Sequence, residues 1–167
     1  MVARMLKTKG VLEYCECARK VKKMHKDATF YYVGGEGNLT ANDIKEYIDD
    51  GSIEFIGSVM DVRPYLNQSA VLILPSYREG MPVSVMEAQS SGRAVIVTDC
   101  AGSRDTVKDG FNGFIVPIGD VDGLVEKCVW CIANPQETLS MCQNAREFAT
   151  VNFDSKRINN IIYSIIE

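Results

Sequence analysis

The length of 167 residues, with 46% hydrophobic and 24% charged residues, is typical of a single globular domain with a core of its own. The formal net charge of −4 argues against nucleic acid as the main partner, because a nucleic-acid surface needs a basic stripe. No apolar run approaches the roughly 20 residues that a membrane span requires. We therefore treat residues 1–167 as one domain.

Helices and strands are predicted to alternate along the whole chain. In order, the sequence predicts helix Val11–Lys26, strand Ala28–Val33, helix Asn42–Asp50, strand Ile53–Ile56, helix Asp61–Gln68, strand Ala70–Leu74, helix Pro82–Ser91, strand Ala94–Thr98, helix Arg104–Lys108, strand Gly113–Val116, and helices Val121–Ala133, Pro135–Val151 and Ser155–Ile166. Short apolar strands between helices indicate a parallel sheet covered on both faces. The predicted fold is α/β, a doubly wound parallel sheet of the Rossmann-like class.

Both ends of the chain suggest neighbouring structure. Met1–Met5 has the pattern of the last residues of a strand, so we expect that upstream sequence has been removed. The last helix carries an apolar stripe at helical spacing, formed by Ile158, Ile161, Ile162, Ile165 and Ile166. We expect this stripe to pack on the domain's own sheet. Docking of part of it onto an absent partner domain is the alternative.

The cysteines favour reduced thiols over disulfides or a metal site. Cys128 and Cys131 have a C-x-x-C spacing, but they lie within a helical pattern and lack a second pair of ligands. No signal peptide precedes the cysteines, which fits a reducing compartment. We therefore predict no metal site. The six cysteines are Cys15, Cys17, Cys100, Cys128, Cys131 and Cys142.

The stretch Pro75–Gly92, PSYREGMPVSVMEAQSSG, has the layout of a ligand site at the carboxyl edge of a parallel sheet. Pro82 fits the first turn of a helix, whose free N–H groups and positive dipole end suit an anion such as a diphosphate. Glu79 and Glu87 can point into one crevice, where a carboxylate accepts hydrogen bonds from adjacent sugar hydroxyls. On spacing alone, they can equally be solvated surface charges. The complete order of these features favours nucleotide-sugar chemistry.

Two more segments add groups to that edge. Arg4 and Lys9 flank a strand-to-helix turn that ends at Gly10. Two cations there are well placed to hold a diphosphate, although basic residues are also common in loops. The segment GGEG at 34–37 follows a strand, but the third glycine of a dinucleotide-binding fingerprint would fall at Thr40. We interpret it as a glycine loop near a ligand, with a plain turn as the alternative.

Together, three segments resemble the carboxy-terminal half of family 4 glycosyltransferases, which are retaining enzymes with the GT-B fold. The segments are ARMLKTKG, LPSYREGMPVSVMEAQSSG and AGSRDTVKDGFNGFIVP, in that order. The resemblance covers essentially the whole chain. It implies two Rossmann-like domains facing across a cleft, with this chain as the donor-binding domain. The amino-terminal domain, which binds the acceptor, is absent.

The resemblance also implies a role for each candidate residue. Arg4 and Lys9 would bind the donor diphosphate and Glu79 would contact the transferred sugar, which makes these three the catalytic candidates. Glu87 would hold the ribose hydroxyls. The remaining candidates would line the sugar-phosphate pocket, the base and the nucleotide edge: Gly80, Met81 and Val83 for the pocket, Val59 for the base, and Gly35 for the edge.

The implied reaction transfers a hexose from a UDP- or GDP-sugar to a glycan or lipid-linked acceptor in polysaccharide biosynthesis, with retention and without a cofactor or divalent metal. Negative charge develops on the leaving diphosphate, and two cations and a helix N-terminus stabilise it. The resemblance implies a cytoplasmic protein, peripheral at the inner membrane face through its other half, and an inactive fragment. The alternatives are a sugar-nucleotide epimerase of related two-domain fold and a non-catalytic doubly wound regulatory domain.

Overall fold

The computed structural model describes residues 1–166, except for the side chains of Ile158, Asn160, Ile161, Ile162 and Ile166. The elements in chain order are η1 (Lys7–Lys9), α1 (Val11–Met24), β1 (Tyr31–Val33), η2 (Ala41–Ile44), α2 (Lys45–Asp49), β2 (Glu54–Gly57), α3 (Arg63–Gln68), β3 (Val71–Leu74), α4 (Val83–Ser90), β4 (Ala94–Thr98), α5 (Ala101–Arg104), β5 (Gly113–Val116), α6 (Val121–Ala133), α7 (Pro135–Asn152) and α8 (Ser155–Ile166). The alternation of strands and helices is therefore confirmed.

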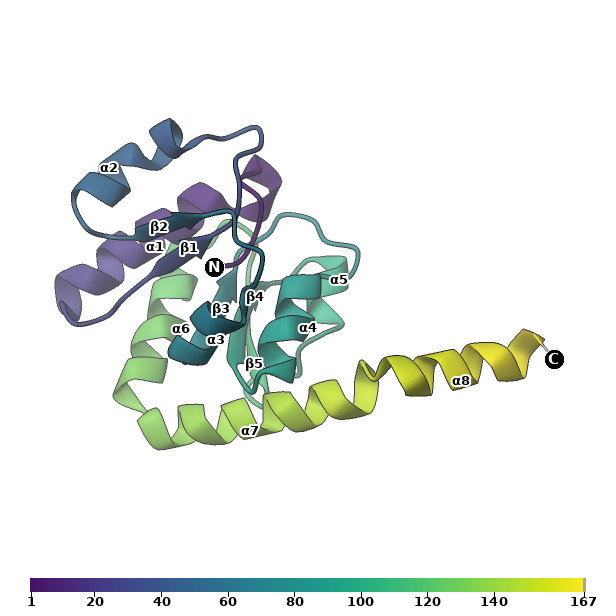
Figure 1. The fold of residues 1–167 in the computed structure, drawn as a ribbon. Helices are drawn as coiled ribbons and strands as arrows, with labels where there is room; N and C mark the ends of the chain where they lie inside the picture. The colour runs from purple at the N-terminus through teal and green to yellow at the C-terminus, as the bar shows by residue number, and fades with distance from the viewer. Residues whose placement is uncertain (167) are drawn as a thin grey trace.

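The strand pairs are all parallel, as predicted, and they form two groups (Figure 1). β1 pairs with β2, whereas β4 lies between β3 and β5. The first residues run beside β1, with a parallel bridge between Val2 and Val33. Helices α4 and α7 pack against β4, and α6 packs against β5 and α1. The result is a Rossmann-like α/β domain with helices around parallel strands.

The core extends through both groups of strands. Every residue of β4 is buried, which accounts for its uninterrupted apolar sequence. Tyr14 of α1 packs edge-on against Phe30 and Tyr32, with ring centroids 6.0 and 6.1 Å away. Between β1 and β3 lies a cavity of about 830 Å³, whose lining includes Tyr31 and Val71. The two groups of strands are thus held together through helices and loops, with open space between their facing edges.

Two predicted elements differ in extent from those in the structure. The strand predicted over Ala28–Val33 is limited to β1, three residues long. The helix predicted over Asn42–Asp50 is divided into η2 and α2. Thr40 and Asp43 form a capping box at the start of η2, which fixes a tight first turn before the α-helical geometry begins.

The helix predicted over Arg104–Lys108 is displaced towards the N-terminus. α5 ends at Arg104, and the hydroxyl of Thr106 then donates to the carbonyl of Ser103 over 2.7 Å. Gly102 lies in α5 so close to the preceding loop that an added Cβ would come within 1.7 Å of the Gly80 carbonyl oxygen. A contact distant in sequence therefore decides where this short helix lies.

Pro82 is also displaced from its predicted place. It precedes α4 with φ −75° and ψ 103°, and the helix begins at Val83. The Pro82 carbonyl accepts the first helical hydrogen bonds, from the backbone of Val85 at 3.0 Å and of Met86 at 3.2 Å. Pro82 is thus the cap residue of α4 rather than a member of its first turn.

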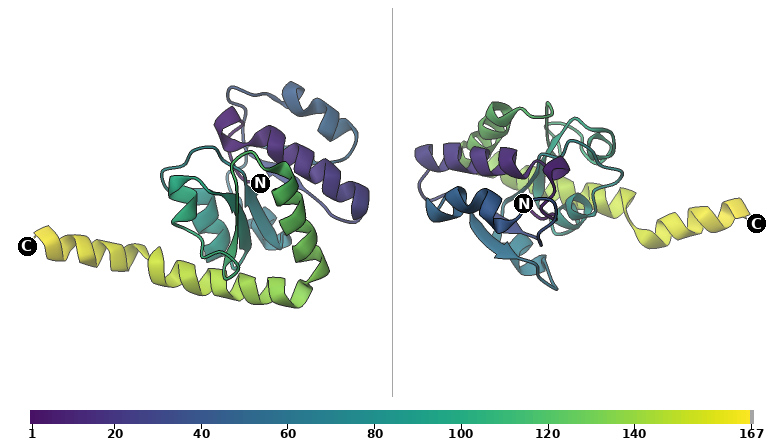
Figure 2. Two further views of the ribbon diagram at one scale, coloured as in Figure 1. Left: turned by 180° about the vertical axis from the view of Figure 1, so that it is seen from behind. Right: turned by 90° about the horizontal axis from the view of Figure 1, so that it is seen from above.

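The structure does not place the last helix on the domain's own sheet. α8 continues from the end of α7 away from the body (Figures 1 and 2). Asp154 accepts the backbone N–H groups of Lys156 at 2.7 Å and Arg157 at 3.3 Å, which starts a new helix after α7. Tyr163 and Ile165 are exposed. Among the stripe residues, the side chains of Ile158, Ile161, Ile162 and Ile166 lie outside the described residues.

The cysteines are free and buried; that the thiols are kept reduced stays a prediction. Over residues 1–166, His, Cys, Asp and Glu side chains do not gather in groups of three or more that could hold a metal ion. No helix within the same range has both the length and the apolar character needed to cross a bilayer.

Candidate functional site

The start of α1 packs tightly against the loop that follows β3. Gly10 has φ 70°, and an added Cβ would lie 2.0 Å from the carbonyl oxygen of Pro75. Only glycine fits this position, because both the conformation and the space exclude a side chain. The backbone N–H of Tyr77 donates to the carbonyl of Thr8 over 2.8 Å. These backbone contacts place Lys9 opposite residues 76–79.

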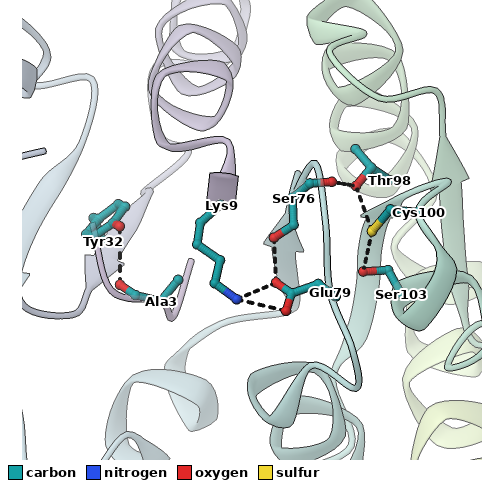
Figure 3. A network of polar contacts seen from close by, with 8 residues as sticks. All are labelled: Ala3, Lys9, Tyr32, Ser76, Glu79, Thr98, Cys100 and Ser103. Carbon is teal, nitrogen blue, oxygen red and sulfur yellow. Dashed lines mark hydrogen bonds and ion pairs between the residues drawn. The ribbon is translucent and has the colours of Figure 1, made fainter. Parts of the chain in front are cut away.

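Lys9 and Glu79 form a partly buried ion pair (Figure 3). Lys9 Nζ lies 2.7 Å from Glu79 Oε1 and 2.8 Å from Oε2. The Glu79 side chain is only 6% exposed, whereas that of Lys9 is 26% exposed. A carboxylate withdrawn from water needs such a partner, because its lost hydration is otherwise uncompensated. The pair joins η1 to the loop after β3, which are far apart in the sequence.

A buried hydroxyl group also contacts Glu79, and a second one holds the residue that carries it (Figure 3). Ser76 Oγ donates to Glu79 Oε1 over 2.7 Å, and the hydroxyl of Thr98 donates to the backbone carbonyl of Ser76. Thr98 belongs to β4, so this sequence of contacts ties the loop to a buried strand. Neither residue is among the site candidates that the sequence predicted. The signal for Ser76 was present in PSYRE, where a hydroxyl stands three residues before the carboxylate.

The backbone of the Glu79 loop is held by α5. The N–H of Gly102 donates to the Glu79 carbonyl over 3.3 Å, and Gly102 lies directly against Gly80. Gly102 is not among the site candidates that the sequence predicted. Its part in the site follows from a contact that no local pattern predicts.

The other loop residues lie after strands. Arg4 is exposed and follows Met1–Ala3, Gly35 follows β1, and Val59 follows β2. The Gly35 carbonyl accepts the N–H of Met5 over 2.8 Å, and an added Cβ at Gly35 would lie 3.6 Å from the Ser58 Cβ. The loops that carry Arg4, Gly35 and Val59 are therefore neighbours.

Met81, Val83 and Glu87 are exposed in the α4 segment. Among the residues that the structure describes, no side chain caps α4, which leaves the amides of its first turn available to an anion. Within residues 1–166, neither Arg4 nor Glu87 has an ion-pair partner. The structure thus pairs Lys9 with Glu79. Convergence of Arg4 and Glu87 on the same ligand stays a prediction.

The fold is that of a Rossmann-like domain of GT-B glycosyltransferases. The chain is similar to Alr3699/HepE of Anabaena, whose crystal structure is in complex with UDP, with a TM-score of 0.91, 21% identity, and coverage of 99% of this chain and 47% of that one. It is also similar to the C-terminal domain of the glycosyl transferase group 1 family protein LpcC from Francisella tularensis, with a TM-score of 0.80, 23% identity, and coverage of 91% and 83%. These likenesses concern the fold.

The family is shown by sequence. Residues 1–134 match the family described as "Glycosyl transferases group 1", and the chain belongs to this family. It is 32% identical over 149 residues to the N,N'-diacetylbacillosaminyl-diphospho-undecaprenol alpha-1,3-N-acetylgalactosaminyltransferase of Campylobacter jejuni. It is 31% identical over 169 residues to the UDP-Gal:alpha-D-GlcNAc-diphosphoundecaprenol alpha-1,3-galactosyltransferase of Escherichia coli. The matches cover 89% and 96% of this chain, but only 39% and 43% of those relatives.

Proposed function

We propose that this chain is the donor-binding, carboxy-terminal domain of a retaining glycosyltransferase. The complete enzyme transfers a hexose from a UDP- or GDP-sugar to a glycan or lipid-linked acceptor. The observation that carries the proposal is the Lys9–Glu79 pair, which lies on loops beside the carboxyl ends of parallel strands in a member of the glycosyltransferase family. Two relatives named for transfer to sugars on undecaprenol diphosphate support a lipid-linked acceptor.

The complete enzyme has a second domain that binds the acceptor. The chain spans less than half of the curated relatives named above. We further propose that the enzyme acts in the cytoplasm, at the inner face of the membrane, where its lipid-linked acceptor is presented. Residues 1–167 alone then bind the donor weakly and transfer nothing.

The donor extends across the loops described above. Arg4 and Lys9 bind the diphosphate, Glu79 contacts the transferred sugar, and Glu87 holds the ribose hydroxyls. The other contacts come from Gly35 and Val59 near the nucleotide and from the backbone of Gly80, Met81 and Val83 near the sugar-phosphate. An ammonium group has three N–H donors, so Lys9 can keep its contacts with Glu79 and still donate to a phosphate oxygen.

The proposed chemistry needs neither a cofactor nor a metal. When the bond between the anomeric carbon and the diphosphate breaks, negative charge grows on the leaving phosphate. Arg4, Lys9 and the amides at the start of α4 stabilise that charge more strongly in the transition state than in the ground state. Arg4 can bind two phosphate oxygens through its planar fork, while Lys9 supplies a point charge beside the sugar.

Isothermal titration of the chain with UDP, GDP and ADP at low salt tests the donor site. We expect one of the nucleotides to bind, and we expect Arg4→Ala and Glu87→Ala each to weaken binding by roughly 5- to 30-fold, because each removes a charged hydrogen bond of about 1–2 kcal/mol. Lys26→Ala, which removes an exposed lysine beyond the far end of α1, is the matched control. Unchanged affinity in both site variants would contradict the assignment.

A further inference from the structure

We propose that Ser76 is a positioning residue, which orients the Glu79 carboxylate so that Oε2 alone offers an open acceptor to the donor sugar. The inference rests on the proposed function and deepens it. It concerns which lone pairs of the Glu79 carboxylate accept hydrogen bonds from the protein and which are open to the ligand. Ser76 itself does not touch the donor in this proposal.

The hydrogen bonds to Glu79 are distributed unequally over its two oxygens. Oε1 accepts hydrogen bonds from Lys9 Nζ and from Ser76 Oγ, both over 2.7 Å. Among these contacts, Oε2 accepts one hydrogen bond, from Lys9 Nζ over 2.8 Å. A carboxylate oxygen has two lone pairs. Oε1 is therefore saturated, while Oε2 keeps one lone pair for a sugar hydroxyl.

Ser76 can impose this orientation because it is itself held firmly. Its side chain and backbone are fully buried, and its carbonyl accepts the hydroxyl of Thr98 from β4. The preceding residue, Pro75, packs against Gly10. A serine hydroxyl has one proton, and here that proton is directed at Glu79 Oε1.

Without the Ser76 hydroxyl, Lys9 no longer distinguishes the two oxygens. The terminal torsion of glutamate is broad and roughly two-fold, so the carboxylate can turn and share the ammonium in more than one way. A sugar hydroxyl must then select one orientation at each binding event. The loss falls on recognition of the sugar, because the base, ribose and diphosphate do not contact Glu79 in the proposed complex.

The test measures how much the sugar adds to nucleotide binding in the complete enzyme. The donor is chosen as the one that the wild type turns over, from UDP-glucose, UDP-galactose, their N-acetylhexosamine counterparts and GDP-mannose. Affinities for the nucleoside diphosphate and for this donor are measured by titration, together with kcat/KM. The variants are Ser76→Ala, Glu79→Ala, the double variant, and Ser52→Ala as a control at another buried serine.

We expect Ser76→Ala to lower kcat/KM by about 10-fold, the loss of one hydrogen bond to a charged group, and to leave the affinity for the nucleoside diphosphate unchanged. In the Glu79→Ala background, Ser76→Ala should cost nothing further, since two residues that act through one contact are not additive. Ser76→Thr, which keeps the hydroxyl, should recover part of the loss. Ser52→Ala should change neither quantity.

Two results would overturn the role of Ser76 while leaving the transferase intact. One is an equal loss of affinity for donor and nucleoside diphosphate in Ser76→Ala, which would indicate a general disturbance of the loop. The other is a double variant in which the loss of kcat/KM is the product of the losses in the two single variants. A wild-type enzyme that turns over no donor would instead refute the proposed function, and the role of Ser76 with it.

Discussion

At the scale of single residues, the candidate site depends on one carboxylate that is nearly removed from water. Lys9 and Ser76 supply three short hydrogen bonds to Glu79, which offset part of the lost hydration of its carboxylate. The arrangement also fixes where each charge lies before any ligand arrives. A preorganised pair of this kind lowers the cost of ordering side chains upon binding.

Replacing Lys9 by methionine tests how far Glu79 depends on its partner. The variant keeps the apolar stem and removes the ammonium, so the buried carboxylate is left with Ser76 alone. We expect the free energy of unfolding to fall by roughly 1–3 kcal/mol, measured by urea denaturation. Glu79→Gln in the Lys9→Met background should recover part of this loss, because a neutral amide is cheaper to bury. Equal or greater instability of the double variant would contradict the argument.

At the scale of elements, two glycines allow separate segments to touch through their backbones. Gly10 brings the start of α1 onto Pro75, and Gly102 brings α5 onto Gly80. The loop after β3 is therefore clamped on both sides, by one element that precedes it and by one that follows it. This clamp holds the stretch of backbone from which Glu79 projects.

Substitution of the two glycines at the α5 contact should have unequal effects. The Cβ of Gly102→Ala would lie 1.7 Å from the Gly80 carbonyl oxygen, whereas the Cβ of Gly80→Ala meets nothing within 4 Å. We expect Gly102→Ala to lower the free energy of unfolding by about 1–3 kcal/mol and Gly80→Ala to leave it nearly unchanged. Thermal unfolding followed by circular dichroism compares them. Equal melting temperatures for the two variants would contradict the prediction, because they would show that the backbone at Gly102 and Gly80 can move apart at little cost.

The same contacts explain which elements could be predicted from the sequence. β3 and β4 were predictable because buried parallel strands have uninterrupted apolar sequences. α5 was predicted in the wrong place, since its position depends on Gly102 meeting Gly80, and local preference contains no information about that contact. α8 has a clear helical pattern, but a pattern specifies an apolar face and not what that face packs against.

At the scale of the whole molecule, the cysteines are part of the core. Burial raises the pKa of the Cys15 thiol to about 12 and that of Cys131 to about 11. A hydrogen bond with Cys17, together with burial, raises the pKa of Cys128 well above its ordinary value. These thiols remain protonated in the folded protein under conditions where an unfolded chain loses its protons.

This difference predicts a loss of stability in alkaline solution. The contribution of each thiol is complete below the unfolded pKa of about 8.5 and is lost as the pH rises towards the folded values near 11 and 12, because only the unfolded state releases protons there. We expect the melting temperature to decline from about pH 8.5 upwards, and to decline less steeply in Cys15→Ala. A melting temperature that is constant to pH 11 would contradict the expectation.

The residues of the candidate site were more predictable from the sequence than the contacts between them. Glu79 and Lys9 were identified as candidates from their neighbours in the sequence, and the resemblance assigned them to the sugar and to the diphosphate. Their direct pairing was not predicted, because nothing local relates a turn before α1 to a loop after β3. Thr98 was missed for the same reason, since it belongs to a strand whose sequence indicates only burial, whereas Ser76 lies three residues before Glu79 and had a local signal.

The clamp on the loop after β3 has a consequence for how relatives of this protein can diverge. Its contacts at Pro75 and Gly80 are made by main-chain atoms, while Arg78, Met81 and Val83 project from the same segment with exposed side chains. Exchanging these side chains alters the shape and polarity that a ligand meets without altering the path of the chain beneath. Substitutions at these exposed positions can therefore change ligand selectivity while the backbone of the loop keeps its conformation.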